Sequence, residues 1–70
     1  MSALEVLAQN LREQRRRRGM TQQALAHASG IHASEISRIE RGAREPRLST
    51  LVRLARALRV TPSDLLARVR

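Results

Sequence analysis

The chain has 70 residues and a net charge of +8, because 14 arginines face only six acidic side chains. This balance favours polyanionic partners, either nucleic acid or an anionic membrane. The absence of cysteine, phenylalanine, tryptophan and tyrosine excludes disulfides, thiol catalysis and aromatic stacking platforms, and it requires an aliphatic core. No apolar run approaches the roughly 20 residues that a bilayer span needs, and no signal peptide is expected.

Apolar residues recur at helical spacing along the whole chain, and no segment alternates with period two, which predicts an all-α protein. Ser2 and Glu5 form a capping-box pattern that opens a first helix, which runs to about Arg18 and is stopped by Gly19. A second helix is predicted between a Thr21 cap and the Ser29-Gly30 pair.

A third helix covers about residues 33–41 and is closed by Gly42, after which "AREPRLS" is a polar loop. The following stretch, residues 48–58, has the strongest amphipathic pattern in the chain. Its predicted inner face consists of Leu48, Leu51, Leu54, Ala55 and Leu58. A cap at Thr61 and a first-turn proline then indicate a short fifth helix within "TPSDLL". We therefore expect five short helices in one domain, residues 1–70.

Two charged residues lie on the apolar sides of their helices. Arg15 follows Leu11 by four residues and so points toward the core, whereas the neighbouring arginines of "RRRR" fan around the helix and cannot form a single patch. Glu40 lies on the same side of the third helix as Ile36. A buried guanidinium needs an anion, so we predict an Arg15–Glu40 ion pair with a structural rather than a catalytic role.

The outward face of the third helix is polar and cationic. It presents Ser34, Ser37, Arg38 and Arg41, with Glu35 to one side and Ala33 at its leading edge. A DNA major groove about 12 Å wide admits a helix decorated in this way, and arginine can bond guanine through its O6 and N7 acceptors. An ordinary solvated helix face is the alternative interpretation of the same residues.

The stretch "GMTQQALAHASGIHASEISRIERGAREPRLSTLVRLARALRVTPSDLL", residues 19–66, closely resembles the phage-repressor-like (XRE type) helix-turn-helix family. The resemblance implies a compact five-helix, lambda-repressor-like domain with its helix-turn-helix at about residues 21–41. It further implies a homodimer on a two-fold symmetric operator. In size and motif the chain also resembles small controller and repressor proteins.

Carried over by position, the resemblance implies roles for individual residues. The implied base-reading residues are Ala33, Ser34 and Arg38, with Ser37 and Glu35 adjacent. The implied phosphate contacts are Gln22, which also braces the recognition helix, Arg41, Arg44 and Arg47. Arg15 and Glu40 match the internal ion pair of the family. Arg47 departs from the family pattern at a helix cap, so either the cap moves to Ser49 or Arg47 is a phosphate ligand.

The histidines and the C-terminal end complete the candidate sites. His27 and His32 are wrongly spaced for a shared zinc site, and no metal or cofactor is expected, but His32 at the recognition-helix cap is a further phosphate candidate. Leu65, Leu66 and Val69 either close the core or form an exposed strip that pairs two copies. In related domains the last helix often supplies the dimer contact, which favours the second alternative.

These features predict a sequence-specific, double-stranded DNA-binding transcriptional regulator, dimeric and without a small-molecule effector. Its expected location is the cytoplasm, as a bacterial or phage-encoded, nucleoid-associated protein. An antitoxin-type or other protein-interaction module is the alternative, and a basic membrane-surface binder is less favoured because caps and turns are well defined. An enzyme is not supported, since no nucleophile–base pair, metal cluster or glycine-rich phosphate loop is present.

Overall fold

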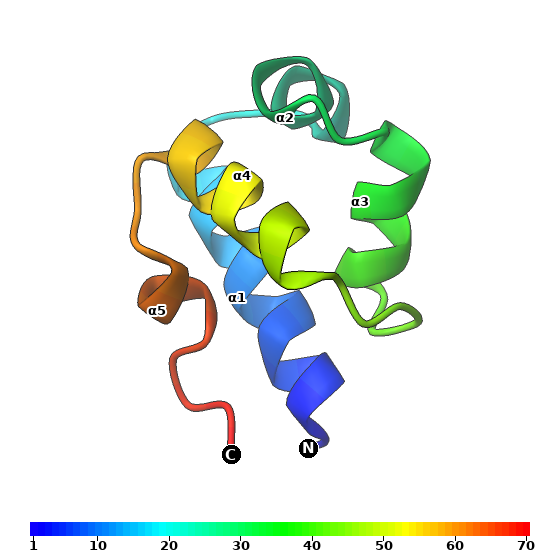
Figure 1. The fold of residues 1–70 in the computed structure, drawn as a ribbon, viewed down its shortest axis with the longest axis vertical. Coiled ribbons are helices and arrows are strands. Elements are labelled where there is room, and N and C mark those ends of the chain that lie inside the picture. Colours follow the sequence, from blue (N-terminus) through cyan, green and yellow to red (C-terminus); the bar gives the residue numbers. More distant parts are fainter.

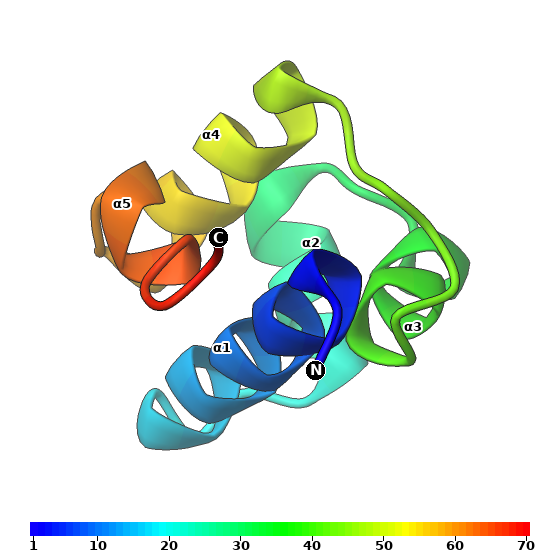
Figure 2. The ribbon, with the colours of Figure 1, turned by 90° about the horizontal axis from the view of Figure 1, so that it is seen from below.

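The structure is a computed structural model that describes all residues from Met1 to Arg70. Its five helices are α1 (Ala3–Arg17), α2 (Gln22–Ser29), α3 (Ala33–Glu40), α4 (Leu48–Leu58) and α5 (Pro62–Leu65). The predicted all-α, five-helix fold is confirmed, and α1 and α3 end one residue earlier than the sequence suggests. Both views in Figures 1 and 2 place α3 and α5 on opposite sides of the molecule, with α1 and α4 between them.

Side-chain caps fix the beginnings of α1 and α5. The Ser2 hydroxyl accepts from the Glu5 N–H at 3.1 Å, and the Glu5 carboxylate accepts from the Ser2 N–H at 2.8 Å. Thr61 and Asp64 form the same reciprocal pair. Hydrogen bonds from the Ser2 and Thr61 backbones lower the pKa of Glu5 and of Asp64, respectively, because they favour the ionised carboxylates. The capping boxes therefore define where both helices start.

The start of α4 differs from two sequence expectations. Arg47 is the N-cap, its side chain makes no capping hydrogen bond, and Ser49 lies inside the helix, so the cap does not move to Ser49. Leu48 is 73% exposed, although the helical pattern placed it on the inner face. The reason is positional: the first turn of α4 extends past its neighbours, and burial begins one turn later at Leu51.

The core is aliphatic and draws on every helix. Its members are Leu7, Leu11, Leu25, Ile36, Ile39, Leu51, Leu54, Ala55, Leu58 and Leu65. Helix α1 packs against α3 and α5, and α4 packs against α2 and α5. The arrangement leaves the side of α3 that faces away from α1 and α2 uncovered. None of the helices combines the length and apolar character needed to cross a membrane.

The segment after α5 is tied to α1 by one buried amide. The Asn10 side-chain nitrogen donates to the carbonyl oxygens of Leu65 at 2.9 Å and Ala67 at 2.6 Å, and its oxygen accepts from Arg68 at 2.9 Å. The Leu65 side chain has no exposed surface and belongs to the core. The expectation that Leu65 contacts a dimer partner is therefore wrong, because burial within its own chain leaves no area for another.

Candidate nucleic-acid interface

Helix α3 has one anchored face and one open face. Ile36 and Ile39 are almost fully buried, with 0% and 1% of their surface exposed. On the opposite side Ser34 and Arg38 are exposed, and the Arg38 guanidinium takes part in none of the ion pairs of the chain. Ala33 and Ser37 are half-buried at the borders between the two faces. The orientation of the helix thus leaves a serine and an arginine free to meet a ligand.

A buried carboxylate joins three helices at the end of α3. Glu40 is only 3% exposed, and its two oxygens accept from Arg15 Nε at 2.7 Å and Arg15 Nη2 at 2.9 Å. Arg15 Nη1 also donates to the Met20 carbonyl at 2.9 Å. The hydrogen bond to Glu40 raises the pKa of Arg15, so the guanidinium stays charged. The two-pronged geometry fixes the direction of α3 relative to α1.

Two further side chains brace the same end of α3. Gln22 at the start of α2 donates to a Glu40 carboxylate oxygen at 3.1 Å, which is a bracing contact between α2 and α3. Arg12 donates to the Glu40 backbone carbonyl, one of the carbonyls that a helix C-terminus leaves without a partner. Sequence reasoning missed Arg12, because an unpaired helix carbonyl indicates that a donor is needed but not which one supplies it.

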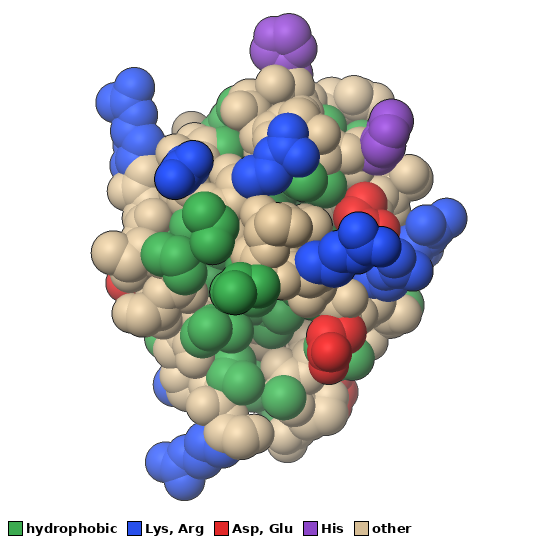
Figure 3. All heavy atoms as spheres, in the orientation of Figure 1, with side chains coloured by type: hydrophobic (Ala, Val, Ile, Leu, Met, Phe, Trp, Pro, Cys, Tyr) green, Lys and Arg blue, Asp and Glu red, His purple; other side chains and the backbone are tan.

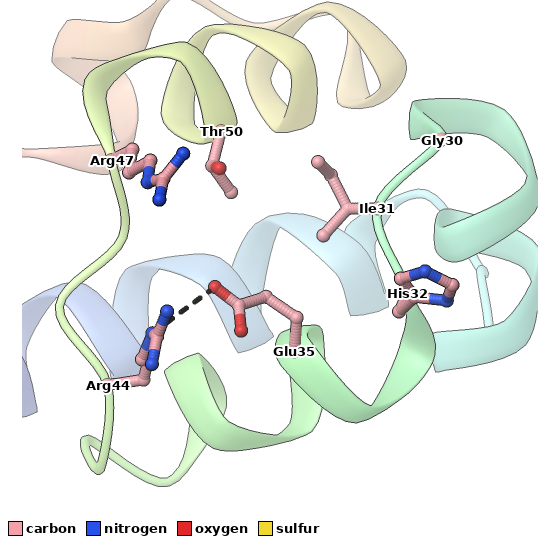
Figure 4. Close-up of a pocket in the computed structure, with 7 residues that line it drawn as sticks. All are labelled: Gly30, Ile31, His32, Glu35, Arg44, Arg47 and Thr50. Carbon is pink, nitrogen blue, oxygen red and sulfur yellow. Dashed lines mark ion pairs between the residues drawn. The ribbon is translucent and has the colours of Figure 1, made fainter.

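Three arginines and one histidine lie around the open face of α3. Arg41 is the C-cap of α3, and His32 is its N-cap without a side-chain capping bond. Arg44 and Arg47 lie in the loop that leads to α4, and all four side chains are exposed. A surface pocket between this loop, α3 and α4 is lined by Gly30, Ile31, His32, Glu35, Arg44, Arg47 and Thr50 (Figure 4). The implied phosphate contacts thus lie beside the implied base-reading helix.

The four consecutive arginines have separate environments, as helix geometry predicts. Arg15 is paired with Glu40, and Arg16 and Arg17 are exposed. Arg18 donates from Nε to the Leu58 carbonyl at 2.7 Å, at the C-terminal end of α4. A cation at that position satisfies unpaired carbonyls and complements the helix dipole. Two of the four arginines, Arg15 and Arg18, therefore have structural contacts, and the run is not a single cationic patch.

An apolar groove opens on another part of the surface, between the start of α1, the start of α4 and the C-terminal segment. It is lined by Ala3, Leu4, Leu7, Glu45, Pro46, Leu48, Leu51, Leu66 and Val69. Leu48 and Leu66 are the most exposed of its leucines, at 73% and 39%. Figure 3 shows hydrophobic side chains gathered on this face, with arginines toward its edges. The sequence predicts Leu66 and Val69 in an exposed apolar strip, but it places Leu48 on the inner face of its helix.

No cluster of three or more histidine, cysteine, aspartate or glutamate side chains that could hold a metal ion occurs in the structure. The short helix α2 is followed, after a turn at Gly30, by α3, whose outward side chains are exposed to solvent. Gly30 makes this turn possible, since its φ of 74° lies in the left-handed region that glycine tolerates without strain. These features define a helix-turn-helix DNA-binding domain.

Comparison with known proteins agrees with this class. The HTH_3 helix-turn-helix family model matches residues 11–65, and the chain belongs to this family. The control protein C.SmaI of Serratia marcescens is 41% identical over 68 residues, which cover 97% of this chain and 81% of that protein.

Solved structures give the same result. The restriction-modification controller protein C.AhdI from Aeromonas hydrophila superposes with a TM-score of 0.86 at 39% identity, covering 89% of this chain and 94% of the other. The hypothetical transcription factor NHTF from Neisseria gives a TM-score of 0.88 at 34% identity, covering 93% and 75%. The resemblance seen in the sequence and the repressor-like fold are confirmed, and the family is one of regulators rather than enzymes.

Proposed function

We propose that the chain is a sequence-specific, double-stranded DNA-binding transcription regulator that inserts α3 into the major groove. The observation that carries this proposal is the exposure of Ser34 and Arg38 on a helix whose other face is fixed by the core and by Glu40. A reading helix must be held rigidly while its polar side chains stay free, because misplaced donors lose discrimination. The similarity to C.SmaI and C.AhdI supports a role as a control protein.

Within this proposal the side chains divide into two groups. Arg38 bonds the O6 and N7 atoms of a guanine, and Ser34, Ser37 and Ala33 allow close approach of the helix to the base edges. The phosphate contacts are made by Gln22, His32, Arg41, Arg44 and Arg47. Phosphate contacts set the register and the salt dependence of binding, whereas base contacts set the sequence preference.

Two arginine variants separate these roles. Arg38→Ala is expected to cost about 1–3 kcal/mol for the preferred duplex and to remove discrimination at one base position. Arg44→Ala is expected to weaken binding to all duplexes alike and to reduce the salt slope by about one. Fluorescence anisotropy with a set of single-base-pair variants measures both, and Arg16→Ala, an exposed arginine on α1, is the matched control. A uniform loss for Arg38→Ala would exclude base reading by this residue.

We also propose that two copies associate through the apolar groove. A two-fold dimer buries the same patch on both subunits, and the groove offers a protruding Leu48 beside a concave apolar surface that can receive its counterpart. The 70-residue chain has a small core, so burial of this patch would also add stability. Two recognition helices would then meet half-sites about 34 Å apart along the DNA.

Sedimentation velocity over a range of concentrations tests this association. The wild-type protein is expected to dimerise, and Leu48→Glu is expected to keep it monomeric, because a charge would be placed in an apolar contact. Ser49→Glu, which adds the same charge to an exposed neighbour on α4 outside the groove, should leave dimerisation unchanged. A wild-type protein that remains monomeric at all concentrations would instead favour the protein-interaction module, with the groove open to a different partner.

A further inference from the structure

Glu35 is an acidic residue on a helix that is expected to approach DNA. Helical geometry places it about 100° from Ile36, on the flank of α3 that faces the loop before α4 and not on the outermost face. Its side chain is only 23% exposed. Figure 4 shows its carboxylate pointing into the pocket toward Arg44, away from His32 on the other side. The direction of the side chain makes a direct base contact by Glu35 unfavourable.

The contact between Glu35 and Arg44 uses only one edge of the guanidinium. The Arg44 Nε atom lies 3.6 Å from Glu35 Oε2, while the Arg44 side chain remains 52% exposed. A guanidinium carries five N–H donors in a planar fork, and Nε is the nitrogen nearest the backbone. An anion held at Nε therefore leaves the terminal amino groups open to a second anion on the solvent side.

Glu35 is also the only carboxylate that lines this pocket. The basic groups around it are the guanidiniums of Arg44 and Arg47 and the imidazole of His32, and the remaining lining residues carry no side-chain charge. Arg47 has no ion pair, so Arg44 is the basic group that Glu35 engages. The acid thus has one specific partner within a surface that is otherwise positive or neutral.

We propose that Glu35 is a positioning residue that orients Arg44 for a backbone phosphate, and that it does not read a base. This inference rests on the proposed DNA binding through α3. With Arg44 present, Glu35 limits the rotamers of a long side chain and reduces the ordering cost of the phosphate contact. Without Arg44, the same carboxylate is an uncompensated negative charge near phosphates. Removal of the Glu35 carboxylate should therefore change DNA affinity differently in the wild-type protein and in the Arg44→Ala variant.

The experiment is a double-mutant cycle in the full chain with wild type, Glu35→Gln, Arg44→Ala and the double variant. Binding is measured by fluorescence anisotropy on a duplex selected from random sequences and on an unrelated duplex of equal length. In the Arg44→Ala background, Glu35→Gln is expected to tighten binding to both duplexes several-fold, since it removes repulsion. With Arg44 present, this gain should be smaller by about threefold or more, or reversed.

A matched control uses the other loop arginine. Glu35→Gln combined with Arg47→Ala should give nearly additive effects, because Arg47 lines the same pocket without an ion pair. Equal effects of Glu35→Gln with and without Arg44 would overturn the proposal. So would an effect that is confined to one base pair and independent of Arg44, which would identify Glu35 as a base reader.

A measurement without DNA separates this proposal from the proposed function. In the free protein, the NMR signal of the Arg44 Nε–H is expected to shift in Glu35→Gln and to remain unchanged in the exposed control Arg16→Ala. An unchanged Arg44 signal in Glu35→Gln overturns the positioning role even if DNA binding is normal. If the Arg44 signal shifts but the protein binds no duplex, the contact between Glu35 and Arg44 is present, and the proposal that it serves DNA binding is refuted.

Discussion

Helix α3 and the segment from α5 to the C-terminus both leave side chains exposed to solvent, but they are held in different ways. Helix α3 has two buried isoleucines and a buried carboxylate bonded by Arg15 and Gln22. The C-terminal segment has one buried leucine, Leu65, and the amide of Asn10. The proposed DNA-reading surface is thus held by several directional contacts, whereas the proposed apolar contact surface is held by one buried side chain and one amide.

The strongest prediction concerns the anchor of α3. Glu40→Ala should lower the free energy of unfolding by about 3–5 kcal/mol, because it leaves the Arg15 guanidinium without its anion in a mostly buried position. Urea denaturation followed by circular dichroism measures this loss. Arg16→Ala, one residue further along α1 and exposed, should change stability by less than about 0.5 kcal/mol. A loss below about 1 kcal/mol for Glu40→Ala would mean that the pair is not an essential anchor.

The second prediction compares two adjacent leucines of the C-terminal region. Leu65→Ala should destabilise the monomer by about 2–5 kcal/mol, because the side chain is fully buried in the core. Leu66→Ala should cost less than about 1 kcal/mol at concentrations too low for association, since Leu66 is 39% exposed. Thermal unfolding of both variants in dilute solution provides the test. Equal losses for the two would contradict the assignment of Leu65 to the core and Leu66 to the groove.

A smaller effect is expected at Asn10. Asn10→Ala leaves the carbonyls of Leu65 and Ala67 without their donor, which should cost about 1–3 kcal/mol. The released segment should be cleaved more rapidly by trypsin after Arg68, and site-resolved mass spectrometry can follow this bond separately. Cleavage after Arg38 on α3 is the internal reference and should change only through overall stability. An unchanged rate after Arg68 would show that Asn10 does not hold the segment.

The smallest effect is the response of the capping boxes to acid. The folded-state pKa values of Glu5 and Asp64 lie below their ordinary values of 4.5 and 3.8. Their contribution to stability is therefore present above the unfolded pKa values and is lost as the pH falls through the folded ones. Between about pH 5 and pH 3, the Tm of the wild type should fall more steeply than that of a Glu5→Gln, Asp64→Asn variant, which lacks both titrating carboxylates. Parallel curves would refute a role for the caps.

Helix α3 and the C-terminal segment also differ in how well their side-chain positions can be predicted from the sequence. Two turns of α3 suffice to define an inward direction from Ile36 and Ile39, so the sequence predicts that Glu40 faces Arg15 and Arg38 faces outward. Helix α5 has only four residues, which is too short for a periodicity that would separate Leu65 from Leu66. The pattern of α4 is long enough, but it does not reveal where the neighbouring helices end, and Leu48 was misplaced for this reason.

Contacts from side chains to distant backbone carbonyls could not be predicted at all. Arg12, Arg18 and Asn10 each donate to a carbonyl oxygen 28 to 57 positions away in the chain. Every residue carries a carbonyl, so the sequence contains no signal that marks the acceptor. The ion pair of Arg15 with Glu40 differs, because both partners are charged and both lie at apolar positions of their helices. The pairing can therefore be predicted from the sequence.

In the proposed function, the outward side chains of α3 select the DNA sequence. Selecting bound fragments from random duplex DNA, in parallel with wild type and Arg38→Ala, tests it most directly. The wild type is expected to enrich a defined site with a guanine preference that Arg38→Ala loses, while the rest of the site is retained. Enrichment of the same site by both proteins, with the guanine intact, would show that Arg38 does not select a base.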